Sequence, residues 1–337
     1  MDKLGCKLLL VFRGEHFHSL VSIGDVQRAI IKGKEMTTPV GEILRKNIRM
    51  GKFSDPKEFL HAEMKKFRME FMPIVDAQGQ LADVVFWEDI FIDLDIESLT
   101  TLDVPVVIMA GGRGVRLKPI TNVIPKALIP LGDKPIIEHI VDRFARKGVK
   151  NFHISVNYKK ELIQQYFQEI PNRLYSVSYF EESSPLGTAG SLHLLKEALN
   201  QTFIVTNCDI LIDDDYPSIL EYHKSNRNEL TVVASIKNYS IPYGILEVGN
   251  ESLLKSIREK PELSFFINAG MYILEPHLLK EVPVNKFYNI TELISSMLES
   301  GRRVGVYPVS DGSWVDVGDW TEYNKASRRL GFGEIGG

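Results

Sequence analysis

The chain has 337 residues, of which 44% are hydrophobic and 25% are charged, as in ordinary globular proteins with one or two domains. Its 40 basic and 44 acidic residues give a net charge of −4, so nucleic acid is not an expected partner. No stretch approaches the roughly 18 consecutive apolar residues of a membrane span, and no basic-then-apolar leader opens the chain. We therefore expect a cytoplasmic protein with no membrane partner.

The first 97 residues contain two similar segments, "HSLVSIGDVQRAIIKG" and "FMPIVDAQGQLADVVFWEDIFI". Each reads as a strand, a polar turn, a second strand and a helix that starts with an acid. These segments resemble the paired cystathionine-β-synthase (CBS) domains, which implies a small α/β module over residues 1–97. The strand and helix expected before "GCKLLLVF" are missing, so either the chain starts too far downstream or the first copy is incomplete.

The CBS resemblance also implies an adenosine-nucleotide site. Its Ser or Thr, three residues before a ribose-binding Asp, is matched by Ser22 and Asp25 in the first copy. In the second copy Phe86 stands at the hydroxyl position before Asp89, which weakens that site. We expect a structural or dimer-forming role ahead of nucleotide sensing, and a homodimer, because such modules often associate side by side.

The stretch "DLDIESLTTLDVP" (93–105) separates two differently patterned regions and predicts a linker at residues 98–103, followed by a second domain at 104–337. Downstream, apolar strands alternate with amphipathic helices predicted at 134–149, 160–170, 187–200, 289–301 and 319–331. That alternation predicts a parallel sheet with helices on both faces. From residue 230 several strands follow one another with short links, which predicts a small β-rich lobe laid on the sheet.

The stretch "VVIMAGGRGVRLKPIT" (106–121) runs from a strand into three glycines, two arginines and a lysine. Glycine lets the backbone turn sharply and approach a phosphate, and the basic side chains add charge around it. It is not a P-loop, and Leu117 stands where the dinucleotide fingerprint needs its third glycine. A nicotinamide-dependent dehydrogenase is therefore remote, and a plain surface turn is the competing interpretation.

Four further features suit phosphate chemistry. Asp209 follows the strand "FIVTN" and Asp316 lies in "SWVDVGDW", so the pair could hold Mg²⁺, although each could equally cap a turn or face solvent. Lys126 lies on a rigid segment between proline and apolar residues, which suits an ammonium that meets phosphate, or a surface lysine. The small residues of "SPLGTAGSL" (184–192) would let a base or phosphate approach, or simply form a turn.

Together these features identify a resemblance to the sugar-1-phosphate nucleotidyltransferases. It rests on "MAGGRGVRLKPIT", "PKALIPLGDKPII", "PLGTAG", "NCD", "YGILEV", "REKP", "NAGMYIL" and "WVDVGDW", all in family order over residues 104 to about 330. The fold implied is a Rossmann-like sheet with helices on both faces and a small β-rich sugar-binding lobe. In many relatives glycine stands directly before the "NCD" aspartate, and here Cys208 replaces it as a small packing variant.

The resemblance implies a role for each matching residue. Catalysis would fall to Arg116 and Lys126, and Mg²⁺ would be held by Asp209 and Asp316. The nucleoside triphosphate would bind at Ala110, Gly111, Gly112, Arg113, Gly114, Pro185, Gly187 and Thr188. The sugar 1-phosphate would bind at Gly244, Glu259, Lys260, Asn268 and Gly270.

The implied reaction is an in-line attack of a hexose or hexosamine 1-phosphate on the nucleotide, with pyrophosphate leaving and no protein nucleophile. The combination with a CBS module resembles bacterial enzymes that make GDP-sugars for surface glycans, so GTP is favoured. Thymidylyl or uridylyl transfer is the alternative within the family. The alternative from another functional class is a regulatory protein of the same family that binds nucleotide without catalysing a reaction.

Overall fold

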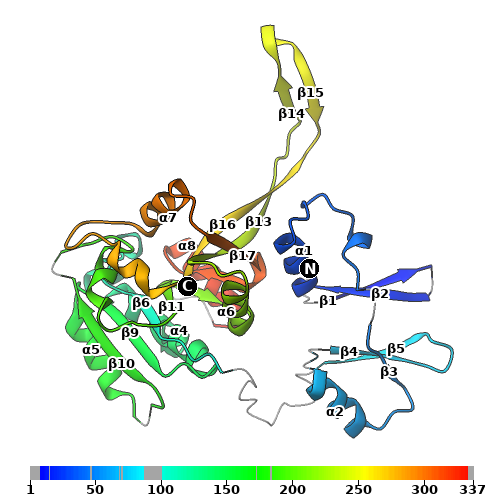
Figure 1. Cartoon of the computed structure of the whole chain (residues 1–337), viewed down its shortest axis with the longest axis horizontal. Coiled ribbons are helices and arrows are strands. Elements are labelled where there is room, and N and C mark those ends of the chain that lie inside the picture. The colour runs from blue at the N-terminus through cyan, green and yellow to red at the C-terminus, as the bar shows by residue number, and fades with distance from the viewer. Residues whose placement is uncertain are drawn as a thin grey trace. The chain divides into compact units, whose positions relative to one another are not determined.

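The computed structural model describes residues 8–14, 16–45, 48–67, 69, 71–86, 101–171, 173–182 and 184–332. The chain divides into two compact units, Met1–Leu99 (unit 1) and Thr100–Gly337 (unit 2), drawn in Figure 1. Among the described residues, no helix combines the length and the apolar character needed to cross a membrane. Asp89 and the start of the predicted linker at residue 98 lie outside the described residues.

The first half of unit 1 is a hairpin followed by a helix. Strands β1 (Leu8–Arg13) and β2 (His16–Ser22) pair antiparallel, and α1 (Ile23–Ile31) starts directly after β2. Ser22 and Asp25 form a capping box, in which each side chain binds the other's backbone N–H, so this local sequence fixes where the helix begins. A short 3₁₀ helix, η2 (Val40–Glu42), follows.

The second half of unit 1 is a three-stranded sheet of order β3-β4-β5 with one helix. Its elements are β3 (Gly51–Lys52), α2 (Lys57–Phe67), β4 (Phe71–Val75) and β5 (Leu81–Phe86). A small core forms where the apolar side of α2 meets β4, and it contains Leu60, Met64, Met72 and Ile74. The second acid-started helix predicted after residue 86 falls outside the described residues.

Unit 2 is built on a seven-stranded sheet of order β10-β9-β6-β11-β16-β13-β17. All neighbouring pairs are parallel except those of β16, which runs antiparallel to β11 and β13. The strands are β6 (Val106–Met109), β9 (Asn151–Val156), β10 (Ser176–Glu181), β11 (Phe203–Asn207), β13 (Leu230–Ser240), β16 (Glu262–Leu274) and β17 (Val304–Ser310). The predicted α/β class, with a largely parallel sheet, is confirmed.

Successive side chains of β6 enter two different cores because strand side chains alternate between faces. Val106 and Ile108 pack on one face with α4 and α6, whereas Val107 packs on the other with η6 and α7. The α-helices of unit 2 are α4 (Ile136–Ala145), α5 (Lys160–Glu169), α6 (Tyr216–Ser225), α7 (Ile290–Glu299) and α8 (Trp320–Arg329). The sheet is thus covered on both faces, as predicted.

Short elements complete unit 2. Its short strands are β7 (Pro130–Leu131), β8 (Lys134–Pro135), β12 (Ile210–Ile212) and β18 (Trp314–Asp316). Its 3₁₀ helices are η3 (Val115–Leu117), η4 (Ile120–Asn122), η5 (Lys126–Leu128), η6 (Gly190–Leu195), η7 (Asn250–Ser252), η8 (Pro276–Lys280) and η9 (Asp311–Ser313).

The α-helix predicted at 187–200 is wrong, because the segment forms only the 3₁₀ helix η6. The backbone N–H groups of Ala189 and Gly190 both donate to the carbonyl oxygen of Tyr288, at 3.0 and 2.9 Å. The start of this segment is therefore bonded to a distant part of the chain, and an ordinary first helical turn is replaced by tertiary contacts.

The predicted small β-rich lobe is built from the same long strands as the main sheet. The inner halves of β13 and β16 belong to the main sheet, and their outer halves pair continuously out to Ser240 and Glu262. The hairpin of β14 (Ile245–Val248) and β15 (Leu254–Arg258) follows at their far end. Residues 237–266, called the arm below, thus project from the sheet (Figure 1).

Candidate active site

The glycine loop begins where β6 ends, at the carboxyl edge of the parallel strands. Gly114 has φ +63°, and a Cβ there would lie 2.8 Å from Cβ of Lys126 and 3.0 Å from Cγ2 of Thr121. Thr121 Oγ1 also donates to the Gly114 carbonyl oxygen at 3.0 Å. Only glycine satisfies both the left-handed backbone and this close packing, so Gly114 seats Lys126 beside the loop.

The outer part of the loop is open. A Cβ built on Gly112 would have nothing within 4 Å, and the side chains of Arg113 and Arg116 are exposed. Ala110, by contrast, is buried in the core below. The loop therefore presents glycine backbone and arginine side chains at a solvent-facing surface, which is what the approach of a phosphate requires.

Two aspartates from distant parts of the chain meet because β12 pairs with β18. Ile210 lies opposite Asp316 in this pairing, and the backbone N–H of Val317 donates to the Asp209 carbonyl oxygen at 2.9 Å. Lys126 Nζ forms an ion pair with Asp209 Oδ2. Both side chains of that ion pair are largely buried, with 10% and 14% of their surfaces exposed.

The absence of a side chain at Gly318 shows how closely the charged groups converge. A Cβ at this residue would lie 2.7 Å from Asp316 Oδ1, 3.2 Å from Asp209 Oδ2 and 3.0 Å from Arg116 Nη2. The sequence-predicted residues Arg116, Asp209 and Asp316 thus surround one small space that glycine leaves free. Gly318, which the sequence reasoning did not single out, is part of the same "WVDVGDW" stretch.

The electrostatics of this space suit a cation. Burial raises the pKa of Asp316, and the neighbouring charge of Asp209 raises it further, against the opposing effect of a hydrogen bond from the Gly318 N–H and of the Lys126 and Arg116 charges. Two carboxylates held this close repel each other, and a divalent cation between them would relieve the repulsion. No cluster of three or more His, Cys, Asp or Glu residues suited to a metal occurs among the described residues. Two carboxylates nevertheless match Mg²⁺, which commonly takes one or two of them and completes its shell with phosphate oxygens and water.

Cys208, directly before Asp209, takes no part in this chemistry. It is a buried free thiol, and burial together with the Asp209 charge raises its pKa to about 12. A thiol with so high a pKa stays protonated at neutral pH and is neither a nucleophile nor a metal ligand.

The "PLGTAG" segment is shaped by packing against the residues before α7. A Cβ on Gly187, at φ +80°, would lie 2.7 Å from the Tyr288 carbonyl oxygen, and one on Gly190 would lie 2.6 Å from that of Lys286. Thr188 Oγ1 accepts a hydrogen bond from the Ile290 N–H at 3.0 Å, at the start of α7. Pro185 is exposed. Packing alone therefore requires glycine at both positions, independently of any role in nucleotide binding.

Glu182, which the sequence reasoning missed, lies under the glycine loop. It follows β10 directly, is only 6% exposed, and its Oε1 would be 3.0 Å from a Cβ on Gly111. Ser155 Oγ donates to Oε1 at 2.8 Å, and the Leu186 N–H donates to Oε2 at 3.3 Å. The carboxylate thus packs against Gly111 of the glycine loop and accepts a hydrogen bond from the "PLGTAG" segment. An acid directly after a strand and shortly before "PLGTAG" was the available signal.

Trp320, also missed, links the C-terminal stretch to the arginine loop. Its indole Nε1 donates to the Lys118 carbonyl oxygen at 2.9 Å. Lys118 comes two residues after Arg116, so helix α8 helps to hold the arginine segment in position.

The residues predicted for the sugar phosphate are not brought together. Gly270, at φ +76°, packs where a Cβ would lie 2.8 Å from Asn207 Nδ2, close in sequence to Asp209. Asn268 accepts from the Gly270 N–H at 3.0 Å and donates to the Tyr272 hydroxyl at 2.8 Å. These two residues therefore lie on the part of β16 that belongs to the main sheet.

Gly244, Glu259 and Lys260 lie on the arm instead. A Cβ on Gly244 would be 2.9 Å from Glu259 Oε2, so these two are neighbours, and both Glu259 and Lys260 are exposed. At about 3.3 Å per residue, the start of β16 is roughly 20 Å along the strand from Asn268. The regular pairing of β13 with β16 from Ala234–Asn268 out to Ser240–Glu262 is what keeps these groups apart.

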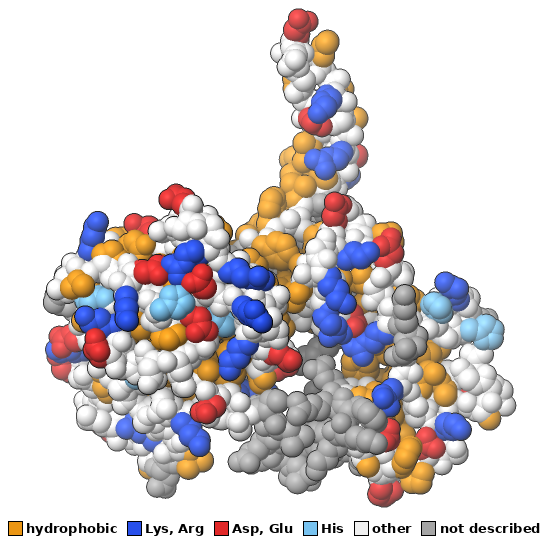
Figure 2. Space-filling view, in the orientation of Figure 1, with side chains coloured by type: hydrophobic (Ala, Val, Ile, Leu, Met, Phe, Trp, Pro, Cys, Tyr) orange, Lys and Arg blue, Asp and Glu red, His pale blue; other side chains and the backbone are white. Residues whose placement is uncertain are grey.

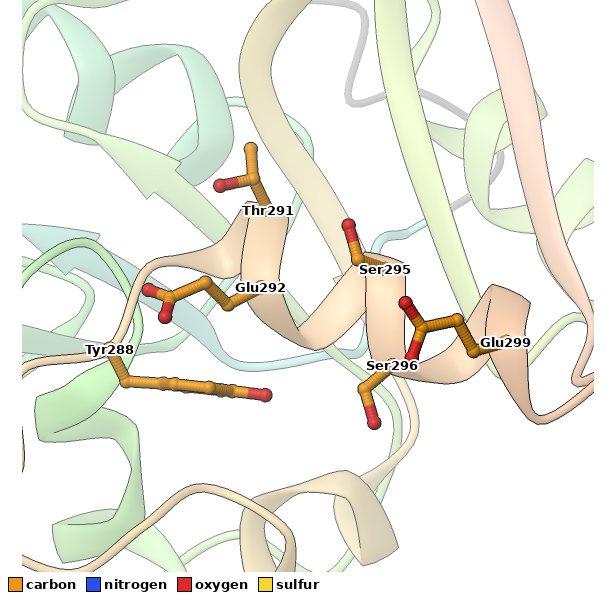
Figure 3. Close-up of a pocket in the computed structure, with 6 residues that line it drawn as sticks. All are labelled: Tyr288, Thr291, Glu292, Ser295, Ser296 and Glu299. Atoms are coloured by element: carbon orange, nitrogen blue, oxygen red, sulfur yellow. The ribbon is translucent and has the colours of Figure 1, made fainter.

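A hollow of about 400 Å³ occurs beside α7 and contains none of the predicted site residues (Figure 3). Its lining consists of Tyr288, Thr291, Glu292, Ser295, Ser296 and Glu299. Two carboxylates and no basic side chain would repel a triphosphate, so this hollow does not suit the predicted substrate.

In unit 1 the predicted ribose-binding acid is already engaged. Asp25 is 7% exposed and accepts hydrogen bonds from the Ser22 N–H at 2.9 Å, from Ser22 Oγ at 2.8 Å and from Arg45 Nε at 2.9 Å, besides an ion pair with Arg28. Burial acts to raise its pKa, but the hydrogen bonds from Arg45, Ser22 and Arg28 outweigh burial and lower it. Arg45 also lies over the ring of Phe71, 5.3 Å from its centroid, so the cluster joins the two halves of unit 1.

Comparison with known proteins assigns the second unit. Residues 105–331 match the model of the nucleotidyl transferase family. The chain is 32% identical over 220 residues to "Mannose-1-phosphate guanylyltransferase catalytic subunit beta" of Danio rerio, and 33% identical over 221 residues to "Mannose-1-phosphate guanyltransferase" of Yarrowia lipolytica. Each alignment covers 63% of this chain and 60% of the relative, so the chain spans somewhat under two thirds of their length.

Solved structures agree on the fold. HddC from Yersinia pseudotuberculosis, complexed with GMP-PN, is 24% identical with a TM-score of 0.54, and the match covers 67% of this chain and 99% of that one. A putative glucose-1-phosphate thymidylyltransferase from Bacillus anthracis is 22% identical with a TM-score of 0.52, over 69% of this chain and 98% of that one. Because the family model matches about two thirds of its residues, the chain belongs to the nucleotidyl transferase family.

Proposed function

We propose that this chain transfers a guanylyl group from GTP to a hexose or hexosamine 1-phosphate and releases pyrophosphate. The observation that carries the proposal is the convergence of Arg116, Asp209 and Asp316 at one point, with Lys126 paired to Asp209, beside an open glycine loop. The matched relatives named as guanylyltransferases support the choice of reaction and of base.

The chemistry needs positioning and charge, not a covalent intermediate. An oxygen of the sugar phosphate attacks the α-phosphorus of the nucleotide, a new P–O bond forms, and the bond to the β-phosphate breaks as pyrophosphate leaves. The attacking group and the α-phosphate are both negative, so their approach is opposed by repulsion. Arg116 and Lys126 offset this repulsion, and the nearly buried Lys126 does so without a large loss of side-chain freedom.

Asp209 and Asp316 are the residues that fit Mg²⁺. The ion would supply positive charge next to the phosphate oxygens. In the structure Asp209 is paired with Lys126, so a metal at Asp209 would compete with that ion pair and leave the ammonium available to phosphate. The chain's own contribution is to hold the two carboxylates in register through the pairing of β12 with β18.

Glu182 is the residue whose chemistry favours guanine over thymine and uracil as the base of the nucleotide. Guanine presents two adjacent donors, N1–H and N2–H, and a carboxylate can accept both. Thymine and uracil present a single N–H flanked by two carbonyl oxygens, which a carboxylate repels. Placed beneath Gly111 and before "PLGTAG", Glu182 lies between the two segments assigned to the nucleotide.

Replacing Glu182 by Gln tests this assignment. The amide keeps an acceptor but places a donor beside it, so we expect kcat/KM for GTP to fall about 10- to 1000-fold, since each lost or unmatched hydrogen bond weakens recognition. The relative use of dTTP or UTP should rise. The matched control is Glu181→Gln, which changes an exposed neighbour paired with Lys160. Equal GTP kinetics in the two variants would show that Glu182 does not read the base.

The proposed sugar-phosphate residues rest on the family resemblance, with Glu259 accepting from sugar hydroxyls and Lys260 meeting the phosphate. Asn268 and Gly270 are the two that lie on the main sheet near Asn207. A role in making GDP-sugars for bacterial surface glycans follows the same resemblance.

Pyrophosphate release across a grid of nucleoside triphosphates and sugar 1-phosphates tests the reaction. Glucose, glucosamine, N-acetylglucosamine and mannose 1-phosphates form one axis. We expect release only when both substrates and Mg²⁺ are present, and only in the GTP row. Activity confined to dTTP or UTP would establish the thymidylyl or uridylyl alternative, and a folded, nucleotide-binding but inactive protein would establish the regulatory one.

For unit 1 we propose a CBS-type module. We favour a structural or dimer-forming role for it over a role in sensing nucleotides. The engagement of Asp25 by Arg45, Arg28 and Ser22 supports that order, because a ribose would have to displace these partners. Equilibrium dialysis with ATP and AMP tests it, and Asp25→Ala should bind no less than the parent chain.

A further inference from the structure

Two neighbouring strands of unit 2 depart from the pattern of a sheet that is buried on both sides. Parallel strands covered by helices on both faces normally carry apolar side chains on both. The pairing of β9 with β10 instead places Asn151 beside Ser176 and His153 beside Ser178 on one face. That face is the one on which Val107, paired with His153, enters a hydrophobic core. These four polar residues, called the polar column below, therefore need a reason other than packing.

The polar column borders a hollow of about 350 Å³ at the amino edge of the sheet. Six polar side chains line it among the described residues, namely Asn151, His153, Ser176, Ser178, Asn200 and Gln201. The rest of this lining is apolar, so none of it carries a charged group. Charged residues make up 25% of the chain, and Figure 2 shows both signs spread over the face of unit 2 that it views. A hollow without charge is therefore a local exception.

The polar groups of the hollow retain capacity for hydrogen bonds. Ser178 Oγ lies 2.7 Å from His153 Nδ1, and Ser176 Oγ donates to Asn151 Oδ1 at 2.9 Å. Among the described residues, no partner is found for His153 Nε2 or for Asn151 Nδ2. Burial lowers the pKa of His153, so its ring is neutral at pH 7. The hollow thus offers donors and acceptors without net charge.

This lining selects a class of ligand by its chemistry. A phosphate, a carboxylate or an ammonium group would need an opposite charge, which the described lining does not supply. A nucleobase would need an exposed ring to stack on, and Phe152, the aromatic residue of the lining, is only 1% exposed. A neutral sugar ring combines hydroxyl groups with apolar C–H faces. The hollow matches both and has a volume typical of small-molecule sites.

We propose that this hollow binds one neutral hexopyranose ring, whose hydroxyls meet the imidazole of His153 and the amides of Asn200 and Gln201. Leu199 contributes an apolar wall. The lining residue Pro105 directly precedes β6, whereas the glycine loop follows β6, so the hollow lies at the other end of the same strand from the candidate active site. The proposal therefore does not depend on the transfer reaction. A free hexose and the terminal residue of a glycan present the same ring.

Nuclear magnetic resonance of the full chain, labelled with ¹⁵N in its histidines, tests binding at this place. The ring signal of His153 is identified by its loss in His153→Gln. Glucose, mannose and galactose are titrated separately at pH 7.5. We expect at least one of them to move the His153 signal saturably with Kd on the order of 1 mM, as befits a small ligand. Glucose 1-phosphate should move it with at least about tenfold weaker affinity, because its charge enters an uncharged hollow.

Asn200→Ala with Gln201→Ala is the test variant. Both residues are exposed and lie before β11, so the change removes two amides from the hollow and keeps His153 as the reporter. We expect Kd for the hexose to rise at least about tenfold, because two hydrogen-bonding groups are lost. The matched control is Gln168→Ala with Asn250→Ala, which removes two exposed amides outside the hollow. Its Kd should stay within about twofold of that of the parent chain.

The methyl α-glycoside of the hexose that binds best separates the two sources of the ring. A glycoside that binds as well as the free hexose supports the proposal with a glycan end as the ligand. A glycoside that binds at least about tenfold more weakly supports it with the free hexose. No movement of the His153 signal with any of the three hexoses up to about 100 mM overturns the proposal. Affinity for glucose 1-phosphate equal to that for the neutral hexoses overturns it too, as does parent-like affinity in the test variant.

Discussion

At the scale of single residues, Gly114 is the position where the glycine loop packs against Lys126, the lysine proposed to take part in the transfer reaction. Its φ is +63°, and a Cβ added there would lie 2.8 Å from Cβ of Lys126, which leaves no room for a side chain. We predict that Gly114→Ala destabilises the fold by about 1 to 3 kcal/mol, from backbone strain and displacement of neighbours. Because Lys126 shifts, kcat should fall at least about tenfold.

Gly112→Ala is the control for that change, since a Cβ there meets nothing within 4 Å. Urea unfolding compares the stability of the two variants, because Gly112 is itself assigned to the nucleotide and its activity is no control. If Gly112→Ala lowers the free energy of unfolding as much as Gly114→Ala does, the packing of Gly114 on Lys126 is not the cause of the loss.

His223 gives the protein a predictable response to acid. Its ring is buried, with Nδ1 near Thr231 Oγ1 at 2.8 Å and Nε2 near Glu275 Oε1 at 3.1 Å. Burial lowers the pKa of His223, and the hydrogen bond to Glu275 opposes this only in part. The unfolded chain therefore takes up the proton first as pH falls below about 6.5, and the free energy of unfolding decreases in that range.

We predict that His223→Gln loses less stability than the parent between pH 7.5 and pH 5.5, although it is less stable at pH 7.5. Urea unfolding at the two pH values gives the comparison. The same loss in both proteins would show that His223 is not the group whose protonation weakens the fold.

Residue types in the sequence were enough to name most residues of the candidate site, but not to predict how these residues are arranged in space. The motifs pointed to Arg116, Lys126, Asp209 and Asp316, and the structure brings all four together. Glu182 escaped because an acid at the end of a strand is common, and only its burial sets it apart.

At the scale of elements, helix α8 supports the arginine loop through one side chain. Trp320 Nε1 donates to the Lys118 carbonyl oxygen at 2.9 Å, and Phe at this position would keep the ring but lose the donor. We predict that Trp320→Phe raises KM for the nucleotide about 3- to 10-fold, with little change in the unfolding midpoint, since one hydrogen bond contributes about 1 kcal/mol.

Tyr323→Phe is the matched change on the same helix, because its hydroxyl donates to the Pro130 carbonyl oxygen and not to the arginine loop. Steady-state kinetics of both variants measure the effect. An unchanged KM in Trp320→Phe, or an equal rise in Tyr323→Phe, contradicts the role given to Trp320.

The sheet could be predicted because hydrophobic runs and helical spacing are local signals. The start of α7 is local too, since Asn289 and Glu292, three residues apart, form its capping box. Strand direction and neighbour order are not local. The insertion of β16 between β11 and β13, and the extension of the arm, arise from pairing over long sequence separations. The 3₁₀ form of residues 190–195 likewise depends on contacts with Tyr288 that no local pattern contains.

At the scale of the whole molecule, every residue assigned to the transfer reaction lies in unit 2, which begins at Thr100. We predict that residues 101–337 alone keep kcat/KM within about threefold of the full chain, because unit 2 has its own cores on both faces of its sheet. Circular dichroism and pyrophosphate release check this. A folded but inactive unit 2 would mean that unit 1 completes the site.

The proposed reaction depends most on Asp209, which lies next to Asp316 and Arg116 and is paired with Lys126. Its most direct test is pyrophosphate release by Asp209→Asn, measured with the nucleotide and sugar phosphate that the parent chain uses. The variant keeps the shape of the side chain but removes its charge from Lys126 and from Mg²⁺, so kcat should fall about 10²- to 10³-fold. Asp133→Asn, at an exposed position, is the control and should match the parent. Parent-like turnover in Asp209→Asn at the same Mg²⁺ concentration would contradict the proposed metal site and the mechanism built on it.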